Sequence, residues 1–355
     1  SEIMRLFSPK SNDFPVATSV FEREVFRFCS DWNEGKVEFQ FHSSGSTGVP
    51  KSIGLTRTQL ISSAELTGQW LSLAPRDVAL MALPVQYIAG AMVLVRALVL
   101  DLDVLLVEPC QNPLEQVQDV SIQLASFVPT QWATILNSNV HVQAIFSKAK
   151  GILIGGASLD TSLEKATVAL DLPIFHTYGM TETVSHVAYR DLHAESPYFH
   201  CLPGIEIQLN TQGCLMVQGP MTADQWIETN DLVHLVDENT FEFVGRADRV
   251  INSGGKKIFP DLVEKWVRRF FAQKKWTGEI LLVGLPDSFY GQKAILFTTI
   301  DLREDEKNLL IDFLKEHLAS EDCPKAIVYR PRFELLRNGK IDALKTVALY
   351  VETIK

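Results

Sequence analysis

Short apolar runs alternate with helix-like segments through the first half of the chain, and no other feature constrains the fold as strongly. Each run is bounded by polar residues, proline or glycine, which is typical of a buried β-strand. Residues 15–30, 56–73 and 89–100 have the composition of helices. Strands that alternate with helices predict an α/β fold with a mostly parallel sheet. The strand-like runs are DVALMAL (77–83), DVLLVE (103–108), IQLASFV (122–128), GILIGG (151–156) and PIFHTYG (173–179).

The pattern changes after Pro203, where apolar segments become shorter and are separated by Gly, Asn and Asp. This region predicts a small antiparallel β unit attached to the first domain. The segment from residue 261 onward reads as a compact α+β unit of about a hundred residues, a common domain size. We therefore expect a large N-terminal domain over residues 1–247 and a small C-terminal domain over residues 248–355.

The overall composition excludes some classes of protein. The 355 residues carry a formal net charge of −10, whereas a nucleic-acid binder needs a basic surface that attracts phosphates. The five cysteines are widely spaced and form no Cys-x-x-Cys pair. Reduced thiols and no zinc site are therefore expected.

The longest apolar tract, from Val78 to Leu100, is interrupted by Pro84, Gln86 and Arg96. These interruptions favour a buried strand followed by a core helix over a membrane span. The first fifteen residues contain no apolar segment typical of a secretory signal. We expect a cytoplasmic protein without membrane insertion.

The segment SSGSTGVPK (43–51) places hydroxylated residues and two glycines ahead of a lysine. Gly45 and Gly48 permit positive φ and a close approach of the backbone to a ligand, and Lys51 adds a positive charge. Pro50 stands where a Walker A loop has its second glycine. Alone, the segment fits either a phosphate-binding loop of another kind or a polar turn. Its other polar residues are Ser43, Ser44, Ser46 and Thr47.

Two further segments carry groups suited to a nucleotide. In YGMTE (178–182), Tyr178 could stack on a base, Thr181 could donate to a phosphate and Glu182 could hold Mg²⁺. The alternative is a strand-to-helix turn that Thr181 caps. In TND (229–231), Asp231 could accept hydrogen bonds from ribose hydroxyls, although most such aspartates form turns.

A local basic patch and a C-terminal lysine complete the set. Residues 245–257 hold four basic residues and one acid, Asp248, within an acidic chain. With Gly254 and Gly255, this segment could take an anionic ligand, or it could be a solvated loop. Lys340 follows a turn-forming Asn338-Gly339 pair. The four basic residues are Arg246, Arg249, Lys256 and Lys257.

In their order along the chain, these motifs resemble the adenylate-forming superfamily of acyl-CoA synthetases, peptide-synthetase adenylation domains and luciferases. The resemblance covers about residues 41–342 and includes GGA (155–157), GRADRVINSGGKKIFP (245–260) and NGK (338–340). It implies an AMP-forming acid–CoA ligase that uses ATP, Mg²⁺ and CoA. A carboxylate and ATP would form an acyl-adenylate and pyrophosphate, and the CoA thiol would then displace AMP.

The resemblance also implies roles for single residues. Lys340 matches the family's catalytic lysine, Thr181 would contact the α-phosphate, and Glu182 would hold Mg²⁺. Asp231 would bind the ribose hydroxyls, assisted by Arg246.

Other positions would shape the site. The loop at 43–51 would hold the β- and γ-phosphates, and Tyr178, followed by Gly179, would stack on adenine. Asp248 matches the hinge position, beyond which a mobile lid domain would present Gly254 and Gly255 to CoA. The wall between adenine and the acyl group would consist of Gly155, Gly156 and Ala157.

Family members usually carry a hundred or more residues before the phosphate loop, where this sequence has 42. This shortened front resembles short-form o-succinylbenzoate–CoA ligases of menaquinone biosynthesis, as do LPVQYIAGAMVLVRAL, FVPTQ and TETVSHV. A shortened domain could expose apolar surface that a second subunit covers, so a homodimer is one expectation.

For the acyl pocket we expect the helix after Tyr87 and the pair Ser185-His186, with His186 or Arg190 facing a second carboxylate. Many of those ligases have His where Gln86 or Tyr87 stands, and Gln where His186 stands, so pocket residues do not transfer directly. Two alternatives stay open: an adenylating enzyme for another carboxylate, and a nucleotide-binding protein without catalysis.

Overall fold

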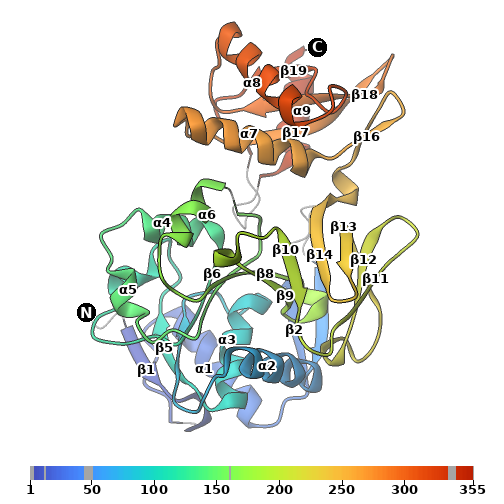
Figure 1. Cartoon of the computed structure of the whole chain (residues 1–355). Helices are drawn as coiled ribbons and strands as arrows, with labels where there is room; N and C mark the ends of the chain where they lie inside the picture. Colours follow the sequence, from blue (N-terminus) through green and yellow to red (C-terminus); the bar gives the residue numbers. More distant parts are fainter. Residues whose placement is uncertain (1–3, 12, 44–50, 160, 335–340, 355) are drawn as a thin grey trace.

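A large mixed sheet forms the centre of the chain in the computed structural model, which describes residues 4–11, 13–43, 51–159, 161–334 and 341–354. Five neighbouring strands in its middle run parallel, as the alternating pattern predicted (Figure 1). In spatial order they are β5 (Asp103–Val107), β4 (Val78–Met81), β6 (Leu124–Phe127), β7 (Gly151–Ile154) and β8 (Ile174–Gly179).

The central strands are buried on both faces. Along β4, Ala79 and Met81 face one apolar core, whereas Leu80 faces a second core on the opposite side of the sheet. Successive side chains of a strand point to opposite faces, so helices must cover both. The first face packs against α1 (Val20–Asn33), α2 (Arg57–Leu71) and α3 (Ile88–Leu100), and the second against α4 (Pro129–Leu136), α5 (Val142–Ile145) and α6 (Thr161–Val168).

The helix predicted over residues 15–30 begins later, at Val20. Ser19 is extended, with φ of −131°, and its hydroxyl accepts a hydrogen bond from the backbone N–H of Glu22 at 3.1 Å. Such a cap satisfies one of the unpaired N–H groups of the first turn and fixes where the helix starts. The apolar tract from Val78 to Leu100 forms β4 and α3, as predicted. Among the described residues, no helix has the length and apolar character that crossing a membrane requires.

Antiparallel strands extend the sheet on both sides. β1 (Met4–Phe7) pairs with β5 at one edge. The antiparallel strands predicted after Pro203 are present, but β9 and β10 join them to β8, so they continue the central sheet. From β8 outward the order is β9 (His186–Asp191), β10 (Tyr198–Cys201), β14 (Thr240–Arg246), β13 (Ile227–Asp237), β12 (Cys214–Gln218) and β11 (Glu206–Leu209).

A separate hairpin carries the two ends of the glycine-rich loop. It pairs β2 (Glu38–Ser43) with β3 (Lys51–Thr56), in a register that ends with Ser43 opposite Lys51. The two residues that flank segment 44–50 are therefore neighbours.

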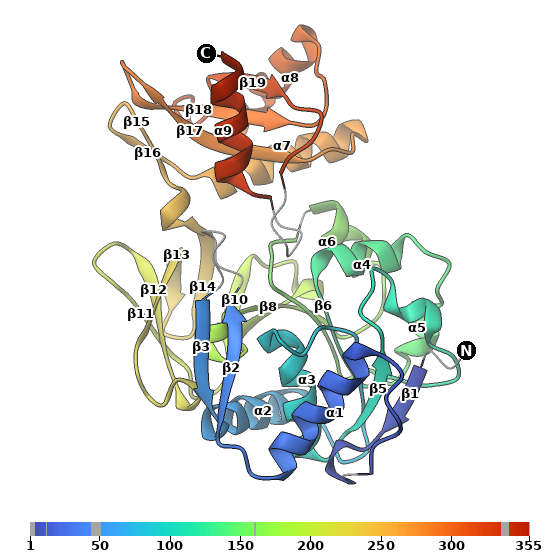
Figure 2. The same cartoon turned by 180° about the vertical axis from the view of Figure 1, so that it is seen from behind.

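The residues after Val250 form a second sheet in the order β16-β15-β18-β17, with β19 beside β18. Figures 1 and 2 show this unit at one end of the molecule, apart from the first sheet. Inside it, the buried carboxylate of Glu264 accepts hydrogen bonds from Arg249, Arg268 and the backbone N–H of Leu282. The elements are β15 (Ile251–Ser253), β16 (Lys256–Ile258), α7 (Pro260–Lys274), β17 (Ile280–Asp287), β18 (Gly291–Thr298), α8 (Glu304–His317), β19 (Ala326–Tyr329) and α9 (Ala343–Ile354).

The two sheets are joined by the 3₁₀ turn η6 (Ala247–Arg249), and the predicted boundary at Asp248 falls within it.

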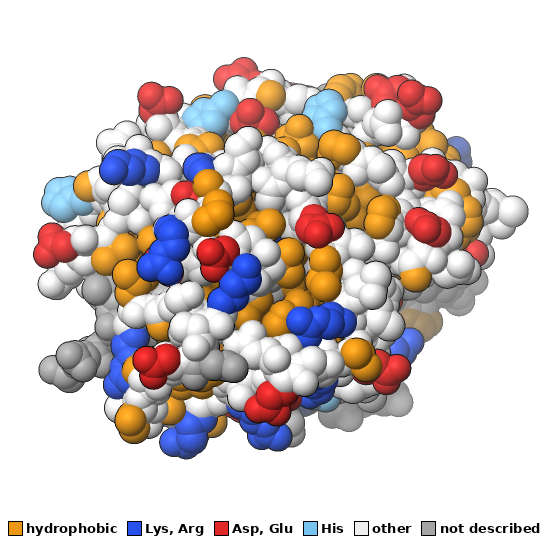
Figure 3. Space-filling view, turned by 90° about the horizontal axis from the view of Figure 1, so that it is seen from below, with side chains coloured by type: hydrophobic (Ala, Val, Ile, Leu, Met, Phe, Trp, Pro, Cys, Tyr) orange, Lys and Arg blue, Asp and Glu red, His pale blue; other side chains and the backbone are white. Residues whose placement is uncertain are grey.

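A view from below shows hydrophobic side chains among charged ones on the face of the molecule opposite the second sheet (Figure 3). Other 3₁₀ turns are η1 (Pro9–Ser11), η2 (Pro113–Gln116), η3 (Thr181–Thr183), η4 (Leu192–Ala194) and η5 (Pro220–Thr222).

Candidate functional site

The GGA turn and the YGMTE segment lie side by side because they follow the adjacent parallel strands β7 and β8. A Cβ atom on Gly155 would approach Thr177 Oγ1 to 2.5 Å, so the two strand ends meet too closely for a side chain there. Gly156 has φ of +85°, a conformation that L side chains rarely adopt. The carboxyl ends of parallel strands are the usual place for ligands in open α/β sheets.

The buried side chain of His176 holds this turn in place. Arg190 Nη2 donates to His176 Nδ1 at 3.3 Å, which leaves Nε2–H to donate to the carbonyl of Ala157 at 3.1 Å. Burial, and then the charge of Arg190, lower the pKa of His176 to about 4. The ring is therefore neutral at physiological pH, in the tautomer that supports Ala157.

Three predicted nucleotide-binding residues are linked by hydrogen bonds. Tyr178 Oη donates to Asp231 Oδ2 at 2.6 Å, and Arg246 Nη1 donates to Asp231 Oδ1 at 3.3 Å. Arg246 also binds both carboxylate oxygens of Asp248, at 3.1 and 2.9 Å. The pairing of β13 with β14 places Asp231 opposite Arg246. The predicted ribose and hinge positions are therefore connected through one guanidinium.

Burial raises the pKa of Asp231, against the opposing effects of Tyr178 and Arg246. Burial, followed by the neighbouring Asp231 charge, raises the pKa of Tyr178 well above its usual value. Tyr178 therefore keeps its hydroxyl proton and remains a hydrogen-bond donor. Its partner, the carboxylate of Asp231, is poorly solvated.

The turn after β8 is tightly built. A Cβ atom on Gly179 would lie 2.2 Å from the carbonyl oxygen of Ser185. Val184 has φ of 67°, rare for a β-branched residue. This turn contains η3, with Thr181 and Glu182, and packs against β2, whose end is Ser43. The predicted phosphate and Mg²⁺ residues thus lie beside the hairpin that carries the two ends of the glycine-rich loop.

Behind this turn lies a buried hydrogen-bonded chain that includes two predicted pocket residues. Arg96 Nη2 donates to Ser185 Oγ at 2.6 Å, and Ser185 Oγ lies 3.2 Å from His186 Nδ1. His186 Nε2 is 3.0 Å from Thr67 Oγ1, which donates to the carbonyl of Ser63. Because Thr67 uses its hydrogen on Ser63, His186 Nε2 carries a hydrogen and Nδ1 accepts one from Ser185. Burial and the charge of Arg96 lower the pKa of His186 well below its usual range, so the ring is neutral.

Other predicted residues lie elsewhere. Gly254 and Gly255 form the turn between β15 and β16 in the second sheet, where Gly254 N–H donates to the carbonyl of Tyr290 at 2.8 Å. Tyr87 precedes α3 and is 41% exposed. Five predicted phosphate-binding residues and the predicted catalytic lysine lie outside the described residues: Ser44, Gly45, Ser46, Thr47, Gly48 and Lys340.

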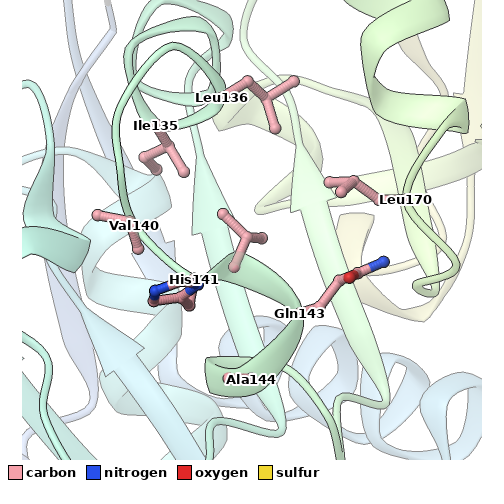
Figure 4. Close-up of a pocket in the computed structure, with 8 residues that line it drawn as sticks. Ile135, Leu136, Val140, His141, Gln143, Ala144 and Leu170 are labelled. Carbon is pink, nitrogen blue, oxygen red and sulfur yellow. The ribbon is translucent and has the colours of Figure 1, made fainter.

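A cavity of about 410 Å³ lies at α4 and α5, where Ile135, Leu136 and Val140 line it beside His141 and Gln143 (Figure 4). None of the predicted site residues lines it. It is therefore separate from the site at the ends of β7 and β8.

A family model for AMP-binding enzymes matches residues 29–223, more than half of the chain. The chain belongs to this family, as the order of its motifs predicted. The fold class predicted from the sequence is likewise confirmed.

Three similar proteins indicate which kind of AMP-binding enzyme the chain resembles. A solved acyl-CoA synthetase (AMP-forming)/AMP-acid ligase II-like protein from Dyadobacter fermentans is 34% identical in sequence. The match covers 98% of this chain and 99% of that protein's chain, with a TM-score of 0.65. The 2-succinylbenzoate–CoA ligase of Lactococcus lactis is 27% identical over 93% of this chain and 73% of its own length. The o-succinylbenzoate CoA synthetase of Bacillus subtilis, solved with its acyl-adenylate intermediate, has the same fold at 24% identity and a TM-score of 0.71, covering 86% of this chain and 68% of its own.

Sequence reasoning missed two buried residues that support the candidate site. Arg96 was noted only as a charge that interrupts an apolar tract, and that position in a core helix was itself the available signal. His176 looked like one more residue of a buried strand, and only the fold brings Arg190 and Ala157 to its ring.

Proposed function

We propose that this chain is an AMP-forming acid–CoA ligase whose carboxylate substrate is 2-succinylbenzoate. The AMP-binding family match and the Dyadobacter relative support the class of reaction. The observation that carries the substrate is the similarity to the Lactococcus 2-succinylbenzoate–CoA ligase over 93% of the chain. In the first half-reaction the acid and ATP form an acyl-adenylate and pyrophosphate; in the second, the CoA thiol displaces AMP.

Asp231 binds the ribose of ATP in this proposal. A carboxylate offers about four lone-pair positions, and Tyr178 and Arg246 occupy two of them. The other two suit the 2′- and 3′-hydroxyls of a ribose. Because the hydroxyl of Tyr178 is engaged with Asp231, the part of this residue left for adenine is the ring.

Adenylation brings together two anions, the carboxylate of the acid and the triphosphate of ATP. Positive charge and fixed donors placed where charge develops are usually the largest contribution to catalysis. Lys51 is exposed at the end of β3, opposite Ser43, and Thr181 lies in the adjacent turn. We assign the loop at 43–51 to the β- and γ-phosphates and Thr181 to the α-phosphate.

Glu182 fits a magnesium ion that arrives with ATP. Its carboxylate is half-buried in η3 and forms no ion pair with another described residue. The described residues contain no group of three or more His, Cys, Asp or Glu that could hold a metal by itself, which suits Mg²⁺, since this ion usually takes one or two carboxylates and the substrate phosphates. When bound, Mg²⁺ would neutralise phosphate charge beside Glu182.

We assign the catalytic charge to Lys340, which would bridge the acyl oxygen and the nucleotide during adenylation. A rotation of residues 248–355 about Asp248 would then withdraw Lys340 and bring Gly254 and Gly255 to CoA. The bond of Asp248 to Arg246 links this hinge to the ribose site.

With a usual thiol pKa of about 8.5, a few per cent of CoA is thiolate at pH 7, which suits attack on an activated adenylate without a dedicated base. A homodimer and a cytoplasmic location stay predictions from the sequence.

A panel of carboxylic acids tests the proposal. With purified protein, ATP and Mg²⁺, pyrophosphate release should depend on 2-succinylbenzoate, and rapid turnover should also require CoA. Lys340→Ala should slow pyrophosphate release by roughly 10²–10⁴-fold, whereas Lys345→Ala, at an exposed lysine five residues later, should not. Turnover with another acid and none with 2-succinylbenzoate would refute the substrate. ATP binding without any adenylate would instead favour a non-catalytic protein.

A further inference from the structure

Asp261 connects the two sides of the hinge turn. It lies in the first turn of α7, and its Oδ2 accepts a hydrogen bond from the backbone N–H of Arg246 at 3.0 Å. Arg246 is the last residue of β14 in the first sheet, whereas α7 belongs to the unit that follows η6. The bond therefore joins residues on opposite sides of Asp248, and a large rotation about Asp248 must break it.

The other oxygen of Asp261 is bound on its own side of the hinge. Oδ1 accepts a hydrogen bond from Arg249 Nη1 at 2.6 Å, and Arg249 also donates to the buried carboxylate of Glu264 at 2.6 Å. The first turn of a helix also favours a negative charge. Asp261 therefore stays paired when its bond to Arg246 breaks, so this bond can open and close at modest cost.

The backbone beside Asp261 leaves room for this carboxylate. A Cβ atom on Gly245 would lie 2.9 Å from Asp261 Oδ2, which is closer than real Cβ atoms approach their neighbours. Gly245 is not among the glycines with positive φ, so its backbone conformation does not require glycine. The missing side chain instead permits the close approach of Asp261 to the end of β14.

In the arrangement that this bond holds, α7 faces the first sheet. Helix α7 contacts α6 and β14, and Figures 1 and 2 show the β15–β16 hairpin at the outer edge of the second sheet. The turn of that hairpin contains Gly254 and Gly255, which the proposed function brings to CoA. These glycines reach the ends of β7 and β8 only after the second unit turns and α7 leaves β14.

We propose that Asp261 is a positioning residue that holds the second unit in the arrangement used for adenylation and releases Arg246 before the CoA step. This inference rests on the proposed function, in which a rotation about Asp248 separates the two half-reactions. The guanidinium of Arg246 binds Asp231 and Asp248, so Asp261 acts on the residue that links the ribose site to the hinge.

Distances between two spin labels test this role without any catalysis. Cys110 is exposed on the first unit, and Leu309→Cys adds a second labelling site at an exposed position of α8. Cys201→Ser removes the half-exposed cysteine, and the other three cysteines are buried. In ligand-free Asp261→Ala, the population with non-native distances should rise roughly tenfold or more, the size expected for losing one hydrogen bond to a charged group.

Two further variants complete the test. Gly245→Ala keeps the carboxylate of Asp261 but displaces it from the N–H of Arg246, so it should produce the same new distances. This variant carries the test if Asp261→Ala does not fold. Glu304→Ala is the matched control, because Glu304 is an acid in the first turn of α8 that pairs only within its own unit, and the native distances should persist.

The rates of the two half-reactions separate this role from a purely structural one. In Asp261→Ala, transfer of a preformed acyl-adenylate to CoA should become up to about tenfold faster, because the rotation is no longer opposed by the bond to Arg246. Formation of the adenylate, measured as pyrophosphate release without CoA, should not become faster. A structural defect would slow both half-reactions.

The possible results are distinguishable. Native distances in both Asp261→Ala and Gly245→Ala would overturn the role of Asp261, and so would new distances of equal population in Glu304→Ala. Slower transfer to CoA in Asp261→Ala would overturn the link between this residue and the rotation. New distances in both hinge variants of a protein that does not activate 2-succinylbenzoate would overturn the proposed substrate and support the role of Asp261.

Discussion

Asp231→Asn removes one negative charge and one of two acceptor oxygens at the proposed ribose site, while it preserves the shape of the side chain. In the native protein, Tyr178 and Arg246 hold the carboxylate by contacts of 2.6 and 3.3 Å. The asparagine has a single acceptor oxygen, so it cannot serve both ribose hydroxyls and its protein partners. The nucleotide should bind more weakly.

The size of the effect follows from the bonds that are lost. With about 1–1.5 kcal/mol for each hydrogen bond, at or below the lower limit for bonds to a charged group, the two lost bonds contribute about 2–3 kcal/mol together. The KM for ATP should therefore rise roughly 30- to 150-fold. Tyr178→Phe leaves both carboxylate oxygens in place and removes only one donor that orients them, so about a fivefold rise is expected.

Stability should respond differently. Burial raises the pKa of Asp231 in the folded protein, which means that folding disfavours its charged form. The neutral isostere should therefore melt within about 2 °C of the native protein. The assay is the dependence of pyrophosphate release on ATP, with Glu228→Gln, an exposed acid on the same strand, as the control. A change of less than fivefold in Asp231→Asn, or a change as large in Glu228→Gln, would refute the assignment.

Two further predictions concern residues that hold the turns after β7 and β8 in place. The pKa of His176 is lowered to about 4, so its contribution to stability is complete above pH 6.5 and is lost as the pH falls towards 4, by about 3 kcal/mol. Denaturant unfolding should show this loss in the native protein relative to His176→Gln, and parallel pH profiles would contradict it. Gly179→Ala should lower the melting temperature more than Gly155→Ala, because the first new methyl group meets a backbone carbonyl and the second meets the side-chain hydroxyl of Thr177. Equal decreases in melting temperature for the two variants would contradict this prediction, because they would show that the turn at Gly179 shifts to make room for the methyl group.

The fold was predictable where a single local pattern determined each element. The five parallel strands were visible as apolar runs, because strands buried on both faces are apolar throughout. The continuity of the sheet was not visible, since it depends on pairing of β9 and β10 with β8 and β14. The start of α1 was misjudged because the cap at Ser19 was not considered.

The candidate site was predictable in part. The sequence alone left Tyr178 and Asp231 as weak, separate candidates, because 52 residues lie between them in the chain. The fold joins them by a hydrogen bond, which no short motif encodes. The same limitation hid Arg96, since its hydrogen bond to Ser185 depends on the fold rather than on any residue pattern.

The most direct test of the account is to incubate the purified chain with ATP, Mg²⁺, CoA and 2-succinylbenzoate and to measure AMP and the CoA thioester together. The account predicts that both form in equal amounts, that neither forms without the acid, and that omission of CoA leaves at most one equivalent of adenylate on the protein. Release of ADP in place of AMP, or thioester formation only with a different acid, would contradict it.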